Sequence, residues 1–439
     1  MLPAMMENEG RVTVSRGLLA LSPMAVFLVS YVAVSLYIGD FYKMPVSVAL
    51  ALASVWAVAL CRRLPLLERI EIFSRAAGHS NILYMIWVFV LAGAFANLAR
   101  ETGAVDATVQ LTLSTFPLRF VVPTLFVAAC FISMAVGTSV GTVVALTPLA
   151  AEIAHASGGG TAFFVAAVLG GAFFGDNLSF ISDTTIASTR SQGCDMADKF
   201  RANLWICLPA ALATLLLYLV HGVDAAAIPA GAEAASAWLV VPYLIVIVAA
   251  CMGVNVLLTL SLGILAAMIA GACTGHGLVS MAGYLGTGID SMGSLIVVTL
   301  LAAGLLGVIK WLGGIAFLLQ SLTRFVGGVR GAQAAIAVLV GLVNLCTANN
   351  TVAIITVGSI ARRISERYGV SPQKAASLLD SSACIVQSLI PYGAQALLAA
   401  SLAGISPVAS IPYLYYPMLL AVAVAVSIIF RLPRSARLK

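Results

Sequence analysis

An oxygen-rich stretch interrupts a long apolar segment in the first half of the chain. It reads Gly175-Asp176-Asn177-Leu178-Ser179-Phe180-Ile181-Ser182-Asp183-Thr184-Thr185. Charged groups at membrane depth are energetically costly, so they usually face a protein interior or a watery cavity and mark an ion or substrate pathway. The Gly-Asp-Asn step predicts a helix break at 175–177, whose freed amides and carbonyls could face a ligand.

Three further groups of polar residues lie inside apolar segments, at 137–142, 347–351 and 380–388. They supply carboxylate, carbonyl, amide and hydroxyl oxygens, which hard alkali cations prefer. The candidate ion- and proton-binding residues are Thr138, Ser139, Thr142, Asp176, Asn177, Ser179, Ser182, Asp183, Thr184, Thr347, Asn349, Asn350, Thr351 and Asp380. Thr185, Ser381, Ser382, Gln387 and Ser388 lie in the same polar groups.

The two carboxylates of the first stretch, Asp176 and Asp183, predict a specific chemistry. On a continuous helix they would share one face, two turns apart. A carboxyl group in a low-dielectric site keeps its proton more readily, and a nearby cation displaces that proton. Exchange of a proton for a metal ion at one group is the minimal chemistry of cation/proton antiport. We therefore expect Na⁺ and H⁺ as coupling ions, Asp176 and Asp183 as Na⁺ ligands, and no cofactor.

Structural roles are the competing interpretation for the same residues. Asp183 could cap a half-helix, and Asp176 could form a turn. Asp380 could pair with a basic residue. Threonines and serines in membrane helices often bond only the carbonyl of the preceding turn.

Composition places these residues in a membrane protein. The 439 residues are 61% hydrophobic and 9% charged, with a mean hydropathy of +1.06. A soluble domain carries far more surface charge, and the continuous Leu-, Ala- and Val-rich segments lack the alternation of barrel strands. The net charge of +6 fits Lys and Arg in cytoplasmic loops and does not indicate nucleic-acid binding. The sequence also lacks zinc-type His-Cys spacing and a nucleotide-phosphate loop, so ATP-driven pumping is not expected.

An internal repeat organises the apolar segments. When the first half of the sequence is aligned with the second at an offset of 209 positions, Thr138 matches Thr347 and Thr142 matches Thr351. Upstream of the hairpins the offset becomes 211. We predict an all-α polytopic membrane protein of two inverted repeats, residues 1–222 and 237–439. Each repeat has about five transmembrane helices, a helical hairpin and a broken helix. The hairpins are expected at 119–156 and 333–361, and the broken helices at 161–190 and 375–401.

The distribution of basic residues orients the repeats. Cytoplasmic loops are enriched in Lys and Arg, which places both termini inside and the uncharged loop 222–236 outside. The mouth of the first hairpin, 155–160, lacks Lys and Arg, whereas the second mouth holds Arg362, Arg363, Arg367 and Lys374. Each half crosses the membrane five times. Because five is odd, the second half starts on the opposite side of the membrane from the first and has the inverted orientation. Inverted repeats with discontinuous helices are typical of secondary transporters, which bind substrates near the midplane.

The stretch Gly175–Thr185 resembles the signature of the NhaC family of sodium/proton antiporters. The earlier Gly137-Thr138-Ser139-Val140-Gly141-Thr142, with Thr147-Pro148 downstream, also resembles that family's hairpin. The resemblance implies a member of the ion transporter superfamily, with ion sites at hairpin tips and broken helices. It suggests Asp176, Ser179, Ser182, Asp183 and Thr184 as functional positions. Phe180 departs from the family pattern, and the Asn-rich second tip resembles sodium-coupled dicarboxylate carriers.

We expect a transporter and not an enzyme: a proton-coupled sodium antiporter that works by alternating access. The alternative is a Na⁺- or H⁺-coupled transporter or exchanger of an amino acid or a small organic acid. A non-transporting membrane scaffold or enzyme is a third class, which no nucleophile-base pair supports. We expect the protein to lie in the lipid bilayer of the cell inner membrane. Its expected partners are a small cation and, in the alternative function, a small organic solute; the sequence is also compatible with a homodimer.

Overall fold

The computed structural model describes residues 13–38, 45–115, 117–180, 182–222, 237–252, 254–322 and 327–432. Throughout these ranges the regular structure is helical, without strands, which confirms the expected all-α class. Ten helices or joined helix pairs within them are long and apolar enough to cross a membrane. The loop 222–236, expected to separate the halves, lies outside the described residues beyond Gly222.

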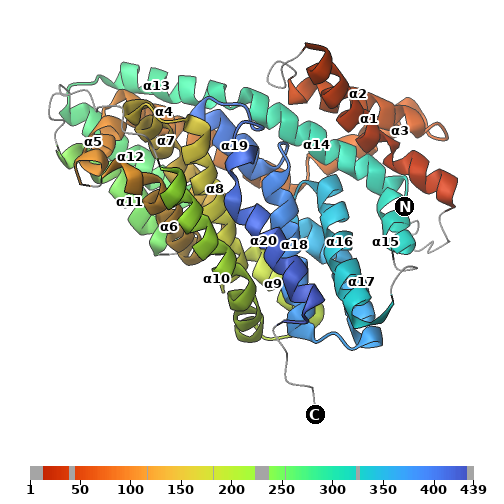
Figure 1. Cartoon of the computed structure of the whole chain (residues 1–439). Helices are drawn as coiled ribbons and strands as arrows, with labels where there is room; N and C mark the ends of the chain where they lie inside the picture. The colour runs from red at the N-terminus through yellow and green to blue at the C-terminus, as the bar shows by residue number, and fades with distance from the viewer. Residues whose placement is uncertain are drawn as a thin grey trace.

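Within the described residues, the helices of the first half run from α1 to α10 (Figure 1). They are α1 (Val14–Ile38), α2 (Val46–Leu60), α3 (Leu66–Ala77), α4 (Ser80–Glu101), α5 (Ala104–Thr115), α6 (Leu118–Val136), α7 (Ser139–Ser157), α8 (Thr161–Leu178), α9 (Asp183–Gln192) and α10 (Met196–His221). Helix α3 carries four charged side chains, Glu68, Arg69, Glu71 and Arg75.

The second half follows the same order of elements. They are η1 (Ala237–Val240), α11 (Val241–Cys251), α12 (Val256–Cys273), α13 (Leu278–Ser291), α14 (Gly293–Trp311), α15 (Gly314–Leu322), α16 (Gly328–Thr347), α17 (Asn350–Tyr368), α18 (Pro372–Leu389), α19 (Ala394–Ala403), η3 (Ile411–Tyr413) and α20 (Tyr415–Ile429).

The element bounds correct the register of the repeat. Helices α7, α8 and α9 each begin and end 211 positions before α17, α18 and α19. The shift of 209 predicted for the hairpins is therefore wrong, and the counterpart of Thr138 is Asn349. Both residues are N-caps with nearly the same φ, −147° and −148°. Thr and Asn are both favoured N-cap residues, so the equivalent caps of the two halves carry different residue types. Matching Thr with Thr therefore gave the wrong offset.

Packing between the halves is reciprocal. Helix α3 packs against α14 as α4 packs against α13, and α9 packs against α17 as α19 packs against α7. In Figure 1, α9 lies below α8 whereas α19 lies above α18, so the two broken helices run in opposite directions. These observations favour the expected inverted repeat, whose domain division stays a prediction.

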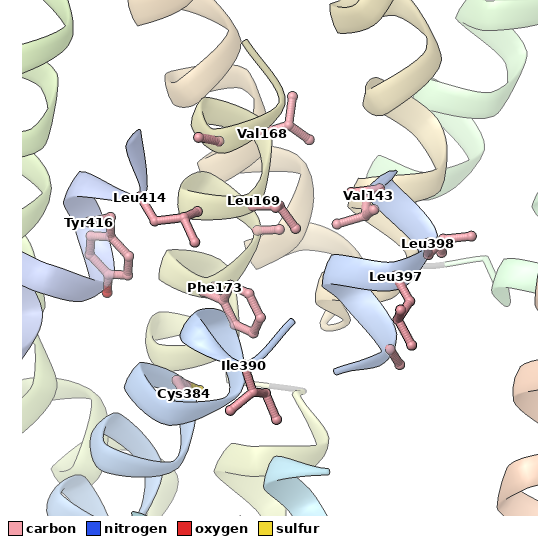
Figure 2. Packing of buried hydrophobic residues seen from close by; sticks show 14 of the residues in the cluster. Val143, Val168, Leu169, Phe173, Cys384, Ile390, Leu397, Leu398, Leu414 and Tyr416 are labelled. Atoms are coloured by element: carbon pink, nitrogen blue, oxygen red, sulfur yellow. The ribbon is translucent and has the colours of Figure 1, made fainter. Parts of the chain in front are cut away.

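The helix breaks lie within the apolar core. Figure 2 shows Ile390, which follows α18, below Phe173 of α8, with Leu397 of α19 and Val143 of α7 on one side of α8 and Tyr416 of α20 on the other. All belong to one buried cluster. Because this shell is close-packed, it holds the polar breaks in fixed positions.

Candidate functional site

The first broken helix breaks later than the sequence predicted. Helix α8 continues through Gly175, Asp176 and Asn177 to Leu178, and α9 begins at Asp183. Gly175 serves packing instead: a Cβ there would lie 2.2 Å from the side chain of Ser133 on α6. The expected break at 175–177 is therefore wrong, because the glycine allows close approach of two helices and does not end one.

Hydroxyl groups satisfy the backbone at the observed break. Ser182 is the N-cap of α9, and its Oγ accepts from Thr185 N at 3.2 Å. The same Oγ lies 2.8 Å from Asp176 O, and Thr184 Oγ1 donates to that carbonyl at 3.2 Å. Since Ser182 caps the helix, the alternative capping role for Asp183 does not apply. Asp183 follows the cap and is exposed.

The first hairpin tip holds the carboxylate of Asp176. Gly137 ends α6 at φ 72°, and Thr138 then caps α7 by accepting from Gly141 N. The next amide, Ser139 N, donates to Asp176 Oδ1 at 2.9 Å. Asp176, 4% exposed, is thereby fixed against the N-terminus of α7.

The second tip has the same geometry with different side chains. Ala348 takes the left-handed conformation (φ 48°) and Asn349 caps α17. A non-glycine residue in this conformation is strained and needs support from its surroundings. Gln387 Nε2 donates to Ala348 O at 3.0 Å, and lies 2.9 Å from Gln395 Oε1. Gln395 Nε2 in turn donates to Ser139 Oγ of the first tip at 3.0 Å, so an amide chain joins the two tips.

A cavity of about 600 Å³ lies where the tips and breaks meet. Its lining contains eight of the predicted site residues: Thr138, Ser139, Asp176, Asp183, Thr184, Asn349, Asn350 and Thr351. Both carboxylates of the first motif therefore face one space, although the helix break separates them. Carboxylate, hydroxyl and amide oxygens converge there from both halves of the chain.

The other six predicted residues lie outside this lining. Asn177 Nδ2 donates to Tyr416 OH at 2.9 Å, and Ser179 Oγ donates to Met134 O at 2.9 Å. Ser182 caps α9, as described above. Thr142 and Thr347 bond backbone oxygens of their own hairpins, at Thr138 O and Asn349 O. The contacts of these residues are structural ones within the described part of the chain.

Asp380, the sixth, forms a buried ion pair. Its Oδ2 lies 2.7 Å from Lys199 Nζ, and both side chains are almost fully buried. Asn203 Nδ2 donates to the same oxygen at 2.8 Å. The alternative role for Asp380, pairing with a basic residue, is thus the one observed.

Sequence reasoning missed several polar residues of this region. Gln395, Asn81, Tyr84 and Asn255 line the cavity, and Lys199 and Asn203 lie beside the break. Gln387, a polar residue outside the candidate ion- and proton-binding set, also lines the cavity. Lys199 lies inside α10, which begins at Met196, and not in a loop before that helix. The spacing of Lys199 and Asn203, one helical turn, was the signal that could have paired them.

The donor set suits an alkali cation or a polar solute. Among the described residues, no group of three or more His, Cys, Asp or Glu side chains gathers to hold a metal ion. A transition-metal or divalent cation site usually gathers several such ligands. The cavity instead mixes two carboxylates with hydroxyls and amides.

The fold and site together define a polytopic helical membrane transporter with discontinuous helices around a central polar cavity. The model of the Na⁺/H⁺ antiporter family matches residues 18–223 and 225–432. The chain therefore belongs to this family, which confirms the resemblance seen in the motifs.

Several proteins with similar sequences are named as antiporters. The chain is 27% identical over 365 residues to the Na(+)/H(+) antiporter NhaC of Alkalihalophilus pseudofirmus, covering 75% of this chain and 78% of that protein. It is 30% identical over 199 residues to the malate-2H(+)/Na(+)-lactate antiporter of Bacillus subtilis, covering 44% and 41%. The crystal structure of the Alcanivorax borkumensis YdaH transporter matches with a TM-score of 0.44 at 13% identity, covering 88% and 99%.

Proposed function

We propose that this protein exchanges Na⁺ for H⁺ across the cell inner membrane by alternating access. The observation that carries the proposal is the position of Asp176 and Asp183, which face one cavity between both hairpin tips and both breaks. A carboxylate in a partly dehydrated site binds either a proton or a cation, and the two compete. Competition at one site is sufficient to couple opposite fluxes.

Neighbouring oxygens would complete the coordination of Na⁺. Thr138, Ser139 and Thr184 line the cavity beside the two carboxylates. Asn349, Asn350 and Thr351 face it from the other half. We propose that a rocking motion of the reciprocally packed halves exposes the cavity alternately to the two sides of the membrane.

Proteoliposomes that contain a pH-sensitive dye test the proposal. Addition of Na⁺ outside should drive protons out of wild-type vesicles and raise the internal pH, with Li⁺ and K⁺ defining the selectivity. The proposal fails if Na⁺ moves no protons in vesicles whose protein is folded and correctly inserted.

The size of the cavity favours a second candidate function. Ligand pockets for small organic molecules are about 300–1,000 Å³, and the observed volume of about 600 Å³ lies within this range. The second half contributes amide side chains, Asn349, Asn350, Gln387 and Gln395, which can hydrogen-bond a carboxylate. The similarity to a malate/lactate antiporter also supports an organic-acid exchanger.

Radiolabelled uptake distinguishes the two functions. Vesicles are loaded with and without Na⁺ and offered a panel of amino acids and of mono- and dicarboxylates. Saturable uptake of one solute, with no proton flux driven by Na⁺ alone, would reject sodium/proton exchange as the function in favour of solute exchange. Proton flux with Na⁺ alone and no solute uptake would support the leading proposal.

A further inference from the structure

A buried lysine–aspartate pair lies next to the α8/α9 break but outside the cavity lining. Lys199 and Asp380 make their 2.7 Å contact with side chains that are 1% and 0% exposed. Lys199 belongs to the first turn of α10, in the first half, and Asp380 to α18, in the second. The pair therefore connects the two halves of the chain.

The orientation of Lys199 is unusual for its place in the helix. Lysines near the ends of membrane helices usually extend their ammonium group toward the aqueous interface. Two charged neighbours of Lys199 are exposed: the side chains of Arg201 and Asp198 are 78% and 49% exposed. Lys199 instead points into the protein, where an ammonium group needs strong partners to offset the loss of water.

The partners of Lys199 lie on both sides of the break. Its Nζ donates to Asn177 O, at the end of α8, at 2.7 Å, and to Thr185 Oγ1, in the first turn of α9, at 2.6 Å. Asn203 Nδ2 donates to the same Asn177 carbonyl at 2.8 Å. Carbonyls in the last turn of a helix lack amide partners, and a cation there also complements the helix dipole.

We propose that Lys199, Asp380 and Asn203 are positioning residues, which fix the α8/α9 break and thereby the carboxylate of Asp176. Asn177, whose carbonyl they bind, directly follows Asp176. None of the three lines the cavity, so they act through the end of α8 and not on the ion. Asp380 anchors the group from the opposite half. This inference rests on the proposed ion-binding role of Asp176.

A neutral double variant, Lys199→Gln with Asp380→Asn, tests the positioning role. Removing both charges together leaves no unpaired charge in the core. The apparent KM for Na⁺ in proton-flux assays should rise about 10–100-fold, the usual range when a partner that orients a ligand is lost. The maximal rate should change much less. Lys199→Arg retains the charge but not the compact geometry of the ammonium group, so it should raise KM by a smaller factor.

Lys374→Met is the matched control, because it also removes a buried lysine. Lys374 is 4% exposed and donates to Ser427 Oγ and Leu432 O, away from the cavity. This variant should keep the wild-type KM, even if its thermal stability falls. An equal KM increase in the control would show that the effect is only structural and would overturn the proposal.

Backbone amide exchange gives a readout that does not depend on the transported solute. Deuterium uptake at residues 176–185, followed by mass spectrometry in detergent, should be faster in the double variant than in wild type or Lys374→Met. Faster exchange without any sodium/proton flux in wild type would support the role at the break while rejecting the proposed transport function. Unchanged exchange and KM in a folded double variant would overturn the positioning role. If the double variant does not fold, the deuterium uptake and the apparent KM for Na⁺ are measured on Lys199→Arg instead. Wild-type values of both in Lys199→Arg would then overturn the positioning role.

Discussion

The two motif aspartates differ in their surroundings. Asp176 is 4% exposed and accepts a hydrogen bond from Ser139 N, whereas Asp183 is exposed to the cavity. The corrected register places Gln387 and Ala394 at the equivalent positions of the second half. The symmetric scaffold therefore carries its cavity carboxylates on one half only, and the other half offers uncharged amides.

Replacing Asp183 with Asn should abolish sodium-driven proton flux. The amide keeps the size of the side chain but can neither release a proton nor supply a negative charge to a cation. Flux in proteoliposomes measures the effect, and thermal unfolding in detergent should match wild type because Asp183 does not cap α9. The matched control is Asp198→Asn, which alters an exposed carboxylate paired with Arg201. Wild-type flux in Asp183→Asn would remove this carboxylate from the mechanism.

At the level of elements, the sequence predicted the first hairpin and both broken helices within a few residues, and the second hairpin less closely. The hairpins were expected at 119–156 and 333–361, and the structure places them at 118–157 and 328–368. The exact break could not be predicted, because it depends on how Gly175 packs against Ser133. The buried position of Lys199 was equally hidden, since its partner Asp380 lies far away in the sequence.

Gly175→Ala should destabilise the protein by about 1–3 kcal/mol, the usual cost of overpacking a tight core. The new methyl group would lie 2.2 Å from the Ser133 side chain and 2.6 Å from its backbone carbon, so helix α6 must move. Thermal unfolding in detergent measures the change. Gly286→Ala, in α13, is the control, because apart from the adjacent residues and backbone of α13 itself no atom lies within 4 Å of the added methyl group. Equal stability of the two variants would contradict the packing role.

At the level of the whole molecule, the reciprocal contacts and the opposite directions of α8 and α18 favour two halves with opposite orientations. Sequence patterns could predict this arrangement because hydropathy, loop charge and repeat spacing can all be read from the linear sequence, without knowledge of the contacts between distant residues. They could not predict the shared cavity, which forms only when the two hairpin tips and the two helix breaks pack together.

Single-cysteine labelling tests the inversion. Ala156 and Arg367 occupy equivalent, exposed positions near the ends of α7 and α17. In an otherwise cysteine-free chain, a membrane-impermeant maleimide added to intact cells should label Ala156→Cys but not Arg367→Cys. Inside-out vesicles should give the reverse pattern. Labelling of both positions from the same side would contradict the inverted arrangement.

Competition between Na⁺ and H⁺ at Asp176 and Asp183 is the central claim, and proton release on Na⁺ binding tests it most directly. The purified protein in weakly buffered detergent is titrated with Na⁺ while a pH indicator reports the medium. Wild type should release protons saturably, with choline as the inert control cation, and the Asp176→Asn/Asp183→Asn variant should release none. Saturable Na⁺ binding by wild type without proton release would contradict the account.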